Sequence, residues 1–410
     1  MISRWIRATG LLAMAPVAAF AFETVDTLRY PSSGAFPAYP ADPAGLWSIF
    51  AYAGVMHDDN PFRREFVEES DTVLRYGAGG RLISHVVGRQ RVLLEGFGEY
   101  WDYDHFSDID HFGYGLRGEW LWEIGNNADG VAGYSRRHRH ADLGEFRVER
   151  RSMITTDRWI VDGGYRFHPD WRWFAGVDYT TEERDGELAG DPRLERTTFA
   201  TSLTYRTPLA NLIGAALRVS NGNARAVTAV GVVTPTDYQE REIAGTLVYN
   251  LGAQLRLSGR LGQTEREYET TPQFDFSGTT YRAAVDWLPT GRLTFNLEGY
   301  REPDSSLDFD ATHVIRQGAS VGAAFAATFK VVFTARFINE QRLYQGDPGT
   351  ALLGLPKRDD TLRTWRFAAG WEPQRHWQLS LGVDIGERTS NRVGQNYEYT
   401  QYMANLRWSY

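Results

Sequence analysis

Residues 377–386 read WQLSLGVDIG, and their side chains alternate strictly between apolar residues and polar or small residues. Successive side chains of a β-strand point to opposite sides, so this alternation predicts a strand with one apolar and one polar face. The polar face carries only Gln, Ser, Gly and Asp. The apolar face carries Trp377, Leu379, Leu381, Val383 and Ile385.

The same alternation recurs along the chain to its last residue, for example at 255–261 and 293–298. Short connections are expected near 87–90, 124–128, 168–170, 207–210, 250–252, 289–291, 326–328 and 373–375. Long polar connections are expected near 58–70, 105–110, 141–149, 184–193, 223–235, 269–275, 303–311, 343–357 and 390–395. Short and long connections alternate, and eight plus nine connections imply eighteen strands, with sixteen as the nearest alternative.

This pattern predicts an all-β fold, an antiparallel up-and-down transmembrane β-barrel. Short turns at one end, long loops at the other and an apolar outer face are typical of outer-membrane barrels. A closed barrel can span lipid because it leaves no strand edge unpaired. Outer-membrane lipid is therefore the expected surroundings of the apolar face.

Composition excludes several other classes of protein. Of the 410 residues, 42% are hydrophobic and 23% are charged, which is typical neither of a disordered chain nor of a helical membrane protein. The absence of Cys excludes disulfides, Cys-ligated metal sites and a Cys nucleophile. A net charge of −8 argues against a nucleic-acid partner.

The N-terminal region differs from the rest. Residues 1–21 combine Arg4 and Arg7 with an apolar run and the cleavage pattern Ala19-Phe20-Ala21, which predicts a secretory signal peptide. Residues 22–45 contain four Pro and little periodicity, and we interpret them as an extended periplasmic N-terminal arm. Residues 46–410 would form the barrel.

Tryptophan residues support an orientation for this barrel. Those beside the short turns or the barrel ends predict an aromatic girdle at one interface, which places the short turns in the periplasm of a Gram-negative bacterium. They are Trp47, Trp120, Trp122, Trp171, Trp173, Trp287, Trp371, Trp377 and Trp408. The aromatic last strand, ending at Tyr410, resembles the signal by which the barrel-assembly machinery recognises its clients.

The face opposite the apolar side chains would line the pore, and it is rich in arginine. The predicted pore-lining residues are Arg75, Arg81, Arg117, Arg166, Arg206, Arg256, Arg260, Arg282, Arg316, Arg336, Arg366, Glu95, Glu119 and Asp286. Such a lumen would favour anions if the Arg charges set the field. It would carry little field if the Arg and acidic side chains pair across strands.

Phe97, Trp101 and Tyr103 would share the inner face of one strand. Their rings could stack on sugar rings in the pore. The alternative is that they pack against an inward-folded loop or the N-terminal arm, because aromatic residues often simply fill space.

The sequence gives no support for catalysis, a cofactor or a metal. His138 and His140 share a face, but the neighbouring Arg residues oppose a cation. Ser220-Asn221-Gly222 resembles the Ser-Asn-Gly of outer-membrane phospholipases, yet Arg218 stands where their general base would be. Arg cannot accept a proton at neutral pH, so we do not expect an enzyme.

Three motifs resemble one family. They are AGVMHDDNPFR at 53–63, GYSRRHRH at 133–140, and the Trp-x-Pro turns at 287–292 and 371–373. Together they resemble the EpsL-type outer-membrane proteins of exopolysaccharide biosynthesis, which belong to the putative β-barrel porin 2 group and often accompany exosortase systems. Within the first motif, Asp58-Asp59-Asn60 predicts an Asx-type turn, with a calcium or sugar contact as the alternative.

The resemblance implies a role in assembly or export of an extracellular polysaccharide, with periplasmic export components as possible partners. The expected function is a pore or scaffold for an anionic exopolysaccharide. Two alternatives remain: a general diffusion porin for small anions, and a non-conducting barrel whose loops bind surface polymer.

Overall fold

The computed structural model describes residues 46–145, 149–185, 193–227, 233–235, 237–305, 311–347, 350 and 354–410. The expected signal peptide at 1–21 and N-terminal arm at 22–45 lie outside these residues. Among the described residues, no helix has the length and hydropathy needed to cross a membrane.

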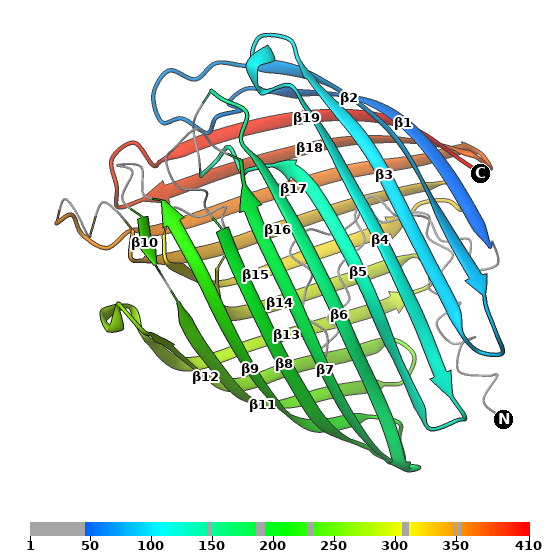
Figure 1. Ribbon diagram of the computed structural model, residues 1–410. Coiled ribbons are helices and arrows are strands. Elements are labelled where there is room, and N and C mark those ends of the chain that lie inside the picture. Colours follow the sequence, from blue (N-terminus) through cyan, green and yellow to red (C-terminus); the bar gives the residue numbers. More distant parts are fainter. Residues whose placement is uncertain are drawn as a thin grey trace.

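Antiparallel strands dominate the described chain, and eighteen of them form a closed barrel (Figure 1). Closure comes from the pairing of β1 with β19, in which Phe50 lies opposite Ser409. The three-residue β10 pairs only with the outer end of β9 and is not part of the wall. The strands are β1 (Trp47–Asp58), β2 (Asp71–His85), β3 (Arg91–Tyr103), β4 (His111–Ile124), β5 (Ala128–His140), β6 (Met153–His168), β7 (Trp171–Arg184), β8 (Arg193–Arg206), β9 (Leu212–Val227), β10 (Val233–Pro235), β11 (Tyr238–Leu251), β12 (Leu255–Tyr268), β13 (Phe276–Thr290), β14 (Leu293–Asp304), β15 (His313–Ala326), β16 (Val331–Gln345), β17 (Asp359–Gln374), β18 (Trp377–Ser390) and β19 (Tyr397–Ser409).

The predicted strand number and fold class are confirmed. Each predicted connection, short or long, overlaps the connection observed between the same two strands of the wall. In the described parts of the long loops there are two 3₁₀ turns, η3 (Ser107–Ile109) and η4 (Pro272–Phe274). In Figure 1 the long loops and the short turns lie at opposite ends of the barrel.

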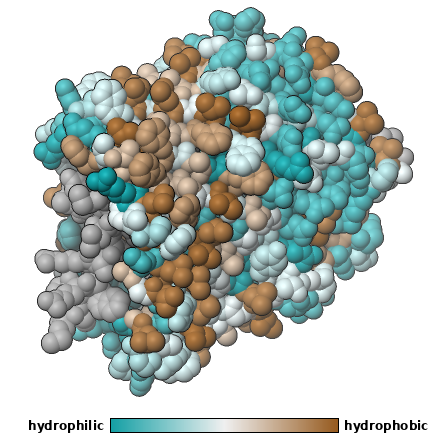
Figure 2. Space-filling view, turned by 180° about the vertical axis from the view of Figure 1, so that it is seen from behind, coloured by the Kyte–Doolittle hydropathy of each residue, from teal (hydrophilic) through white to brown (hydrophobic). Residues whose placement is uncertain are grey.

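The outer face of the barrel is an apolar belt. Outward side chains remain exposed along every segment of the wall, as Leu74, Leu247 and Leu381 illustrate. Figure 2 shows this belt as a brown band beside a teal, hydrophilic end. Several exposed Trp side chains lie at the short-turn end, among them Trp120, Trp171 and Trp377, while exposed Trp159 and Trp365 lie in the middle of β6 and β17. This arrangement matches the apolar band and aromatic girdle of a barrel in a bilayer.

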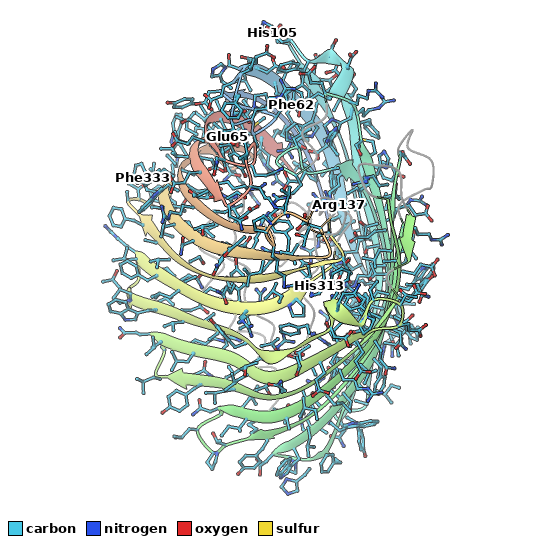
Figure 3. All side chains as sticks on the ribbon, turned by 90° about the vertical axis from the view of Figure 1, so that its left-hand side faces the viewer. Phe62, Glu65, His105, Arg137, His313 and Phe333 are labelled. Carbon is cyan, nitrogen blue, oxygen red and sulfur yellow. The ribbon has the colours of Figure 1, made fainter. Side chains whose placement is uncertain are left out.

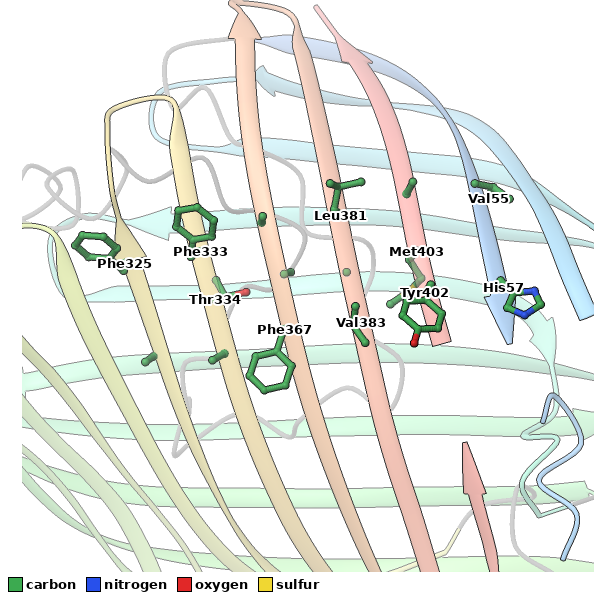
Figure 4. Close-up of a pocket in the computed structure, with 16 residues that line it drawn as sticks. Val55, His57, Phe325, Phe333, Thr334, Phe367, Leu381, Val383, Tyr402 and Met403 are labelled. Carbon is green, nitrogen blue, oxygen red and sulfur yellow. The ribbon is translucent and has the colours of Figure 1, made fainter. Parts of the chain in front are cut away.

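A shallow groove of about 780 Å³ runs across this belt from β15 to β19 and β1 (Figure 4). Small outward residues such as Ala335, Ala369 and Ala404 form its floor. Phe333, Leu381 and the other labelled apolar side chains stand around them. Since the groove lies within the apolar belt, lipid chains would fill it.

The Trp-x-Pro turns disturb the strand register. The ladder between β13 and β14 shifts between Trp287 and Thr290, and the ladder between β17 and β18 shifts between Trp371 and Gln374. Pro289 and Pro373 lie inside these intervals. Because proline cannot donate to a ladder, it is tolerated at such bulges next to a turn.

Candidate functional site

The barrel interior is lined by polar side chains that pair across strands. On β2 to β4, Arg81 Nε lies 3.2 Å from Glu95 Oε1, and Arg117 Nη1 lies 3.5 Å from Glu95 Oε2. Arg117 also donates from Nε to Glu119 Oε1 at 2.7 Å. The structure thus brings four of the predicted lumen residues into one chain of ion pairs.

Arg75 lies further toward the loops on β2 and pairs with Glu99, at 2.5 Å between Nη2 and Oε2. Its guanidinium stacks 4.7 Å from the centroid of the Trp101 ring. Glu99 also accepts a hydrogen bond from the Tyr52 hydroxyl at 2.5 Å. A charge, a ring and a hydroxyl therefore hold this arginine in place.

A second network covers β11 to β16. Arg260 lies 3.1 Å from Glu242, and Arg282 bonds to both Glu298 and Glu302. On the next strands, Arg336 lies 3.4 Å from Glu298, and Arg316 lies 2.7 Å from Glu340. Arg260, Arg282 and Arg336 are thus joined by ion pairs through Glu302 and Glu298, whereas Arg316 belongs to a separate set with Asp304 and Glu340.

The remaining predicted residues have different surroundings. Arg366 lies 3.2 Å from Asp384, and Asp286 accepts a hydrogen bond from Asn296 at 2.8 Å. Near the short turns, Arg166 donates to the carbonyl oxygen of Asn126 at 3.4 Å. Arg206 is the last residue of β8. Arg256 is exposed and has no carboxylate within ion-pair distance among the described residues.

The sequence pattern missed the carboxylates that balance these arginines on β11, β14 and β16. They are Glu240, Glu242, Glu302 and Glu340, all on lumen-facing positions. Their strands carry polar residues on both faces near the loop end, as Arg241 between the two buried glutamates of β11 shows. A strict register count from the apolar half of each strand would have found them.

The three candidate sugar-contacting aromatics lie on the inner face of β3. Phe97 and Tyr103 are buried, with 6% and 7% of their surface exposed. Tyr103 packs with Phe62 and Ile109 of the first two long loops, and Trp101 lies against this cluster. Trp101 also stacks on His111, at 5.7 Å between ring centroids.

The Asp58-Asp59-Asn60 segment forms an Asx-type turn. The Asn60 backbone N–H donates to Asp58 Oδ1 at 3.0 Å. Arg63 Nη1 donates to both oxygens of the same carboxylate, at 2.8 and 3.0 Å. Since Arg63 neutralises Asp58, this carboxylate serves the turn rather than a cation.

Residues 141–145, which follow β5, reach across the lumen to the opposite wall. The side chain of Glu145 is fully buried there, against β16, the residue before β17, and β18. Its carboxylate accepts hydrogen bonds from Arg342 Nη1 at 3.0 Å, from the Tyr344 hydroxyl at 3.2 Å and from Arg388. In the wall, β5 and β18 are separated by β4, β3, β2, β1 and β19, so this contact narrows the channel.

Figure 3 looks along the barrel from the end that carries the long loops. Arg137 and His313 point into the lumen, while Phe333 points outward. The Tyr268 hydroxyl bonds to His313 Nδ1 at 2.8 Å, and Arg266 pairs with Glu240 at 2.5 Å close by. Charged and aromatic groups thus line the lumen near the loops, where a solute would meet them.

Ser220 lies on β9, and its side chain is buried. The Ser220 hydroxyl lies 2.9 Å from the Thr198 hydroxyl, and both are buried. Arg218 pairs with Glu240 at 2.8 Å and with Glu242 at 3.2 Å. These contacts are those of a packed lumen wall.

Comparison with known proteins agrees with this geometry. The family model described as "Putative beta-barrel porin 2" matches residues 238–410. This segment includes both Trp-x-Pro turns, whereas residues 53–63 and 133–140 lie outside it. The fold and this match make the chain a porin-like β-barrel. No curated protein matches the sequence.

Several solved structures are similar to the barrel. The outer membrane protein OpdK of Pseudomonas aeruginosa has 10% identity and a TM-score of 0.49, over 89% of this chain and 98% of that chain. OccK2 (OpdF) of the same species has 12% identity and a TM-score of 0.49, over 88% and 97%. The alcaligin outer membrane receptor FauA of Bordetella pertussis has 14% identity and a TM-score of 0.44, over 88% and 76%.

Proposed function

We propose that the protein is an outer-membrane channel for acidic carbohydrate, serving the biosynthesis and export of an anionic exopolysaccharide. The observation that supports a channel is the closed eighteen-strand wall, with an apolar belt outside and charged side chains inside. A barrel of this strand number is wide enough for an aqueous channel. The polysaccharide role is supported by the resemblance of residues 53–63 and 133–140 to EpsL-type proteins.

Acidic solutes suit the lumen because its arginines are held in fixed positions. Ion pairs and aromatic rings fix Arg75 and Arg282, so their unused N–H groups can face a passing carboxylate without further ordering. Arg256 adds an exposed positive charge near the short turns. Periplasmic export components would deliver the polymer to that end.

A diffusion porin for small anions is the second candidate. It is favoured by the porin family match and by the Glu145 contact, which narrows the lumen that a polymer would have to pass. Small acidic solutes need a smaller opening than a polysaccharide does. The two candidates share the same wall and the same charged groups.

Conductance in a planar bilayer tests the proposal. The full-length protein should give discrete current steps with an anion-biased zero-current potential in a KCl gradient. Polygalacturonate should block these steps, and dextran of equal length should not. Current steps that polygalacturonate does not block would favour the small-anion porin. A complete absence of current steps would contradict the proposal that the protein is a channel.

A further inference from the structure

The barrel wall opposite residues 141–145 carries four donor side chains that surround one carboxylate, here named the receptor. Arg342 and Tyr344 lie on β16, Arg358 immediately precedes β17, and Arg388 lies on β18. All four direct donors at one point, and the Glu145 carboxylate fills it. The guanidinium groups of Arg358 and Arg388 keep only 8% and 1% of their side-chain surface exposed.

This receptor is fixed by groups other than Glu145. Arg358 donates from Nη2 to Asp360 at 2.7 Å, and its guanidinium stacks 3.9 Å from the centroid of the Tyr344 ring. Arg388 lies 4.9 Å from the centroid of the Tyr397 ring. Arg342 donates from Nε to Glu340 at 2.6 Å. The arginines would therefore keep their places after Glu145 leaves, and such preorganisation favours binding.

The balance of buried charges explains why the receptor needs a bound anion. The connected ion pairs join four guanidinium groups to four carboxylates, and Glu145 is one of the four. The groups are Arg316, Arg342, Arg358 and Arg388 with Asp304, Glu340, Asp360 and Glu145. Without Glu145, one buried positive charge lacks a counter-charge, which is unfavourable. Another carboxylate can supply that charge.

The segment that carries Glu145 can move away from the wall without breaking the strand pairing of the barrel. The described loop residues on both sides, 141–145 and 149–152, lie outside the strand ladders. Leu143 packs only partly buried against the apolar loop cluster around Phe62. Glu145 is held at the wall by its carboxylate, and Arg388 Nη1 also donates to the neighbouring Gly144 carbonyl oxygen at 3.2 Å.

We propose that Arg342, Tyr344, Arg358 and Arg388 form a binding site for the carboxylate of an acidic sugar, which Glu145 occupies as an internal ligand and which the incoming sugar takes over. Exchange of one carboxylate for the other releases residues 141–145 from the wall and widens the channel. The site rests on the proposed function, because it names the group by which an acidic solute opens its own path. An internal ligand also lowers the apparent affinity for the external one, by the fraction of sites it leaves vacant.

Calorimetry in detergent micelles tests the site without requiring conduction. Galacturonate is the probe, and galactose is its neutral match. The E145Q variant should bind galacturonate at least about tenfold more tightly than the wild type does, because the competing carboxylate is gone. E145Q/R388Q and E145Q/R342Q should both lose this binding. Equal galacturonate affinity in the wild type and E145Q would overturn the proposal.

The matched control is E149Q. Glu149 lies in the same loop, but its side chain is half exposed. It pairs with Arg64 and not with a residue of the receptor. E149Q should bind galacturonate as the wild type does. If E149Q tightened binding as much as E145Q, a general loss of negative charge would explain the effect, and the proposal would fail.

Bilayer recordings test the gate itself. Galacturonate added at the loop side should lengthen the open times of the wild type, and galactose should not; E145Q should be open without either. Identical open times in the wild type and E145Q would overturn the gate while leaving the channel standing. If no variant conducts, the channel proposal fails, and the calorimetry still decides the carboxylate site.

Discussion

Single arginines in the lumen differ in what surrounds them, and this determines the effect of replacing them. Arg282 is bonded to Glu298 and Glu302 and keeps 18% of its side-chain surface exposed. Arg256 is exposed and has no carboxylate within ion-pair distance in the described part of the wall. The first arginine therefore serves both stability and charge, and the second serves charge alone.

R256S and R282S separate the two roles. R256S should shift the zero-current potential toward cations and leave the free energy of unfolding unchanged. R282S should shift the potential as well and lower the free energy of unfolding by about 1–3 kcal/mol, because two carboxylates each lose one donor. Reversal potentials and urea unfolding in lipid vesicles measure both. Equal unfolding energies for the two variants would contradict the role assigned to Arg282.

Some contacts of individual residues could not be predicted from the sequence. Alternation of apolar and polar residues gives the face of Arg75 or Arg282 directly. It cannot give the partners of Glu145, which are 197 to 243 positions away from it along the chain. Loop residues have no periodicity to read, and a contact across the lumen depends on closure of the whole wall. The aromatics of β3 posed the same problem, since loop residues such as Phe62 cover them.

Turns set the geometry at the level of strand pairs. Gly252 lies in the short turn between β11 and β12 with φ +64°, a conformation that glycine adopts freely. Ala210 holds φ +61° in the short turn between β8 and β9, where an L-residue is strained. At similar positive φ angles, one turn therefore has an unstrained glycine and the other has a strained alanine.

G252A and A210G should have opposite effects on stability. G252A should lower the free energy of unfolding by about 1 kcal/mol, because it places a side chain at a positive φ. A210G should raise it by a smaller amount, because the added glycine also gains freedom in the unfolded chain. Urea titration of the refolded barrel in vesicles gives both values. A stabilising G252A would contradict the backbone conformation of this turn.

Strand ends were predictable because the turn chemistry was visible. Pro289 and Pro373 interrupt the alternation near the ends of β13 and β17, and the register shifts occur in the same intervals. The small β10 was not foreseeable, because a three-residue pairing within a long loop leaves no repeating pattern.

The whole molecule is organised by lipid outside and charge inside. Leu381 lies about midway along the outer face of β18, between Trp377 at the short-turn end and the Glu387–Arg363 ion pair at the loop end. Ser380 precedes it and faces the lumen, where its hydroxyl donates to the Asn405 carbonyl at 3.5 Å. One position therefore meets hydrocarbon and its neighbour meets the channel.

L381R should make insertion and folding less favourable by about 2–4 kcal/mol, the cost of an arginine at the middle of a bilayer. S380R adds the same charge to the lumen side and should change this energy much less. Folding into vesicles, followed by tryptophan fluorescence, compares them. Similar losses for both variants would mean that the outer face of β18 does not meet lipid.

The seam of the barrel is chemically like every other strand junction. Ile49 and Tyr410 exchange two backbone hydrogen bonds of 2.9 Å, and the rings of Trp47 and Tyr410 lie 5.4 Å apart. A short peptide joining these two ends would make the wall an endless ribbon, which could then be cut at any short turn without losing a ladder. Barrel closure thus imposes a cyclic order of strands but no preferred starting strand, and the sequence could be circularly permuted within the same architecture.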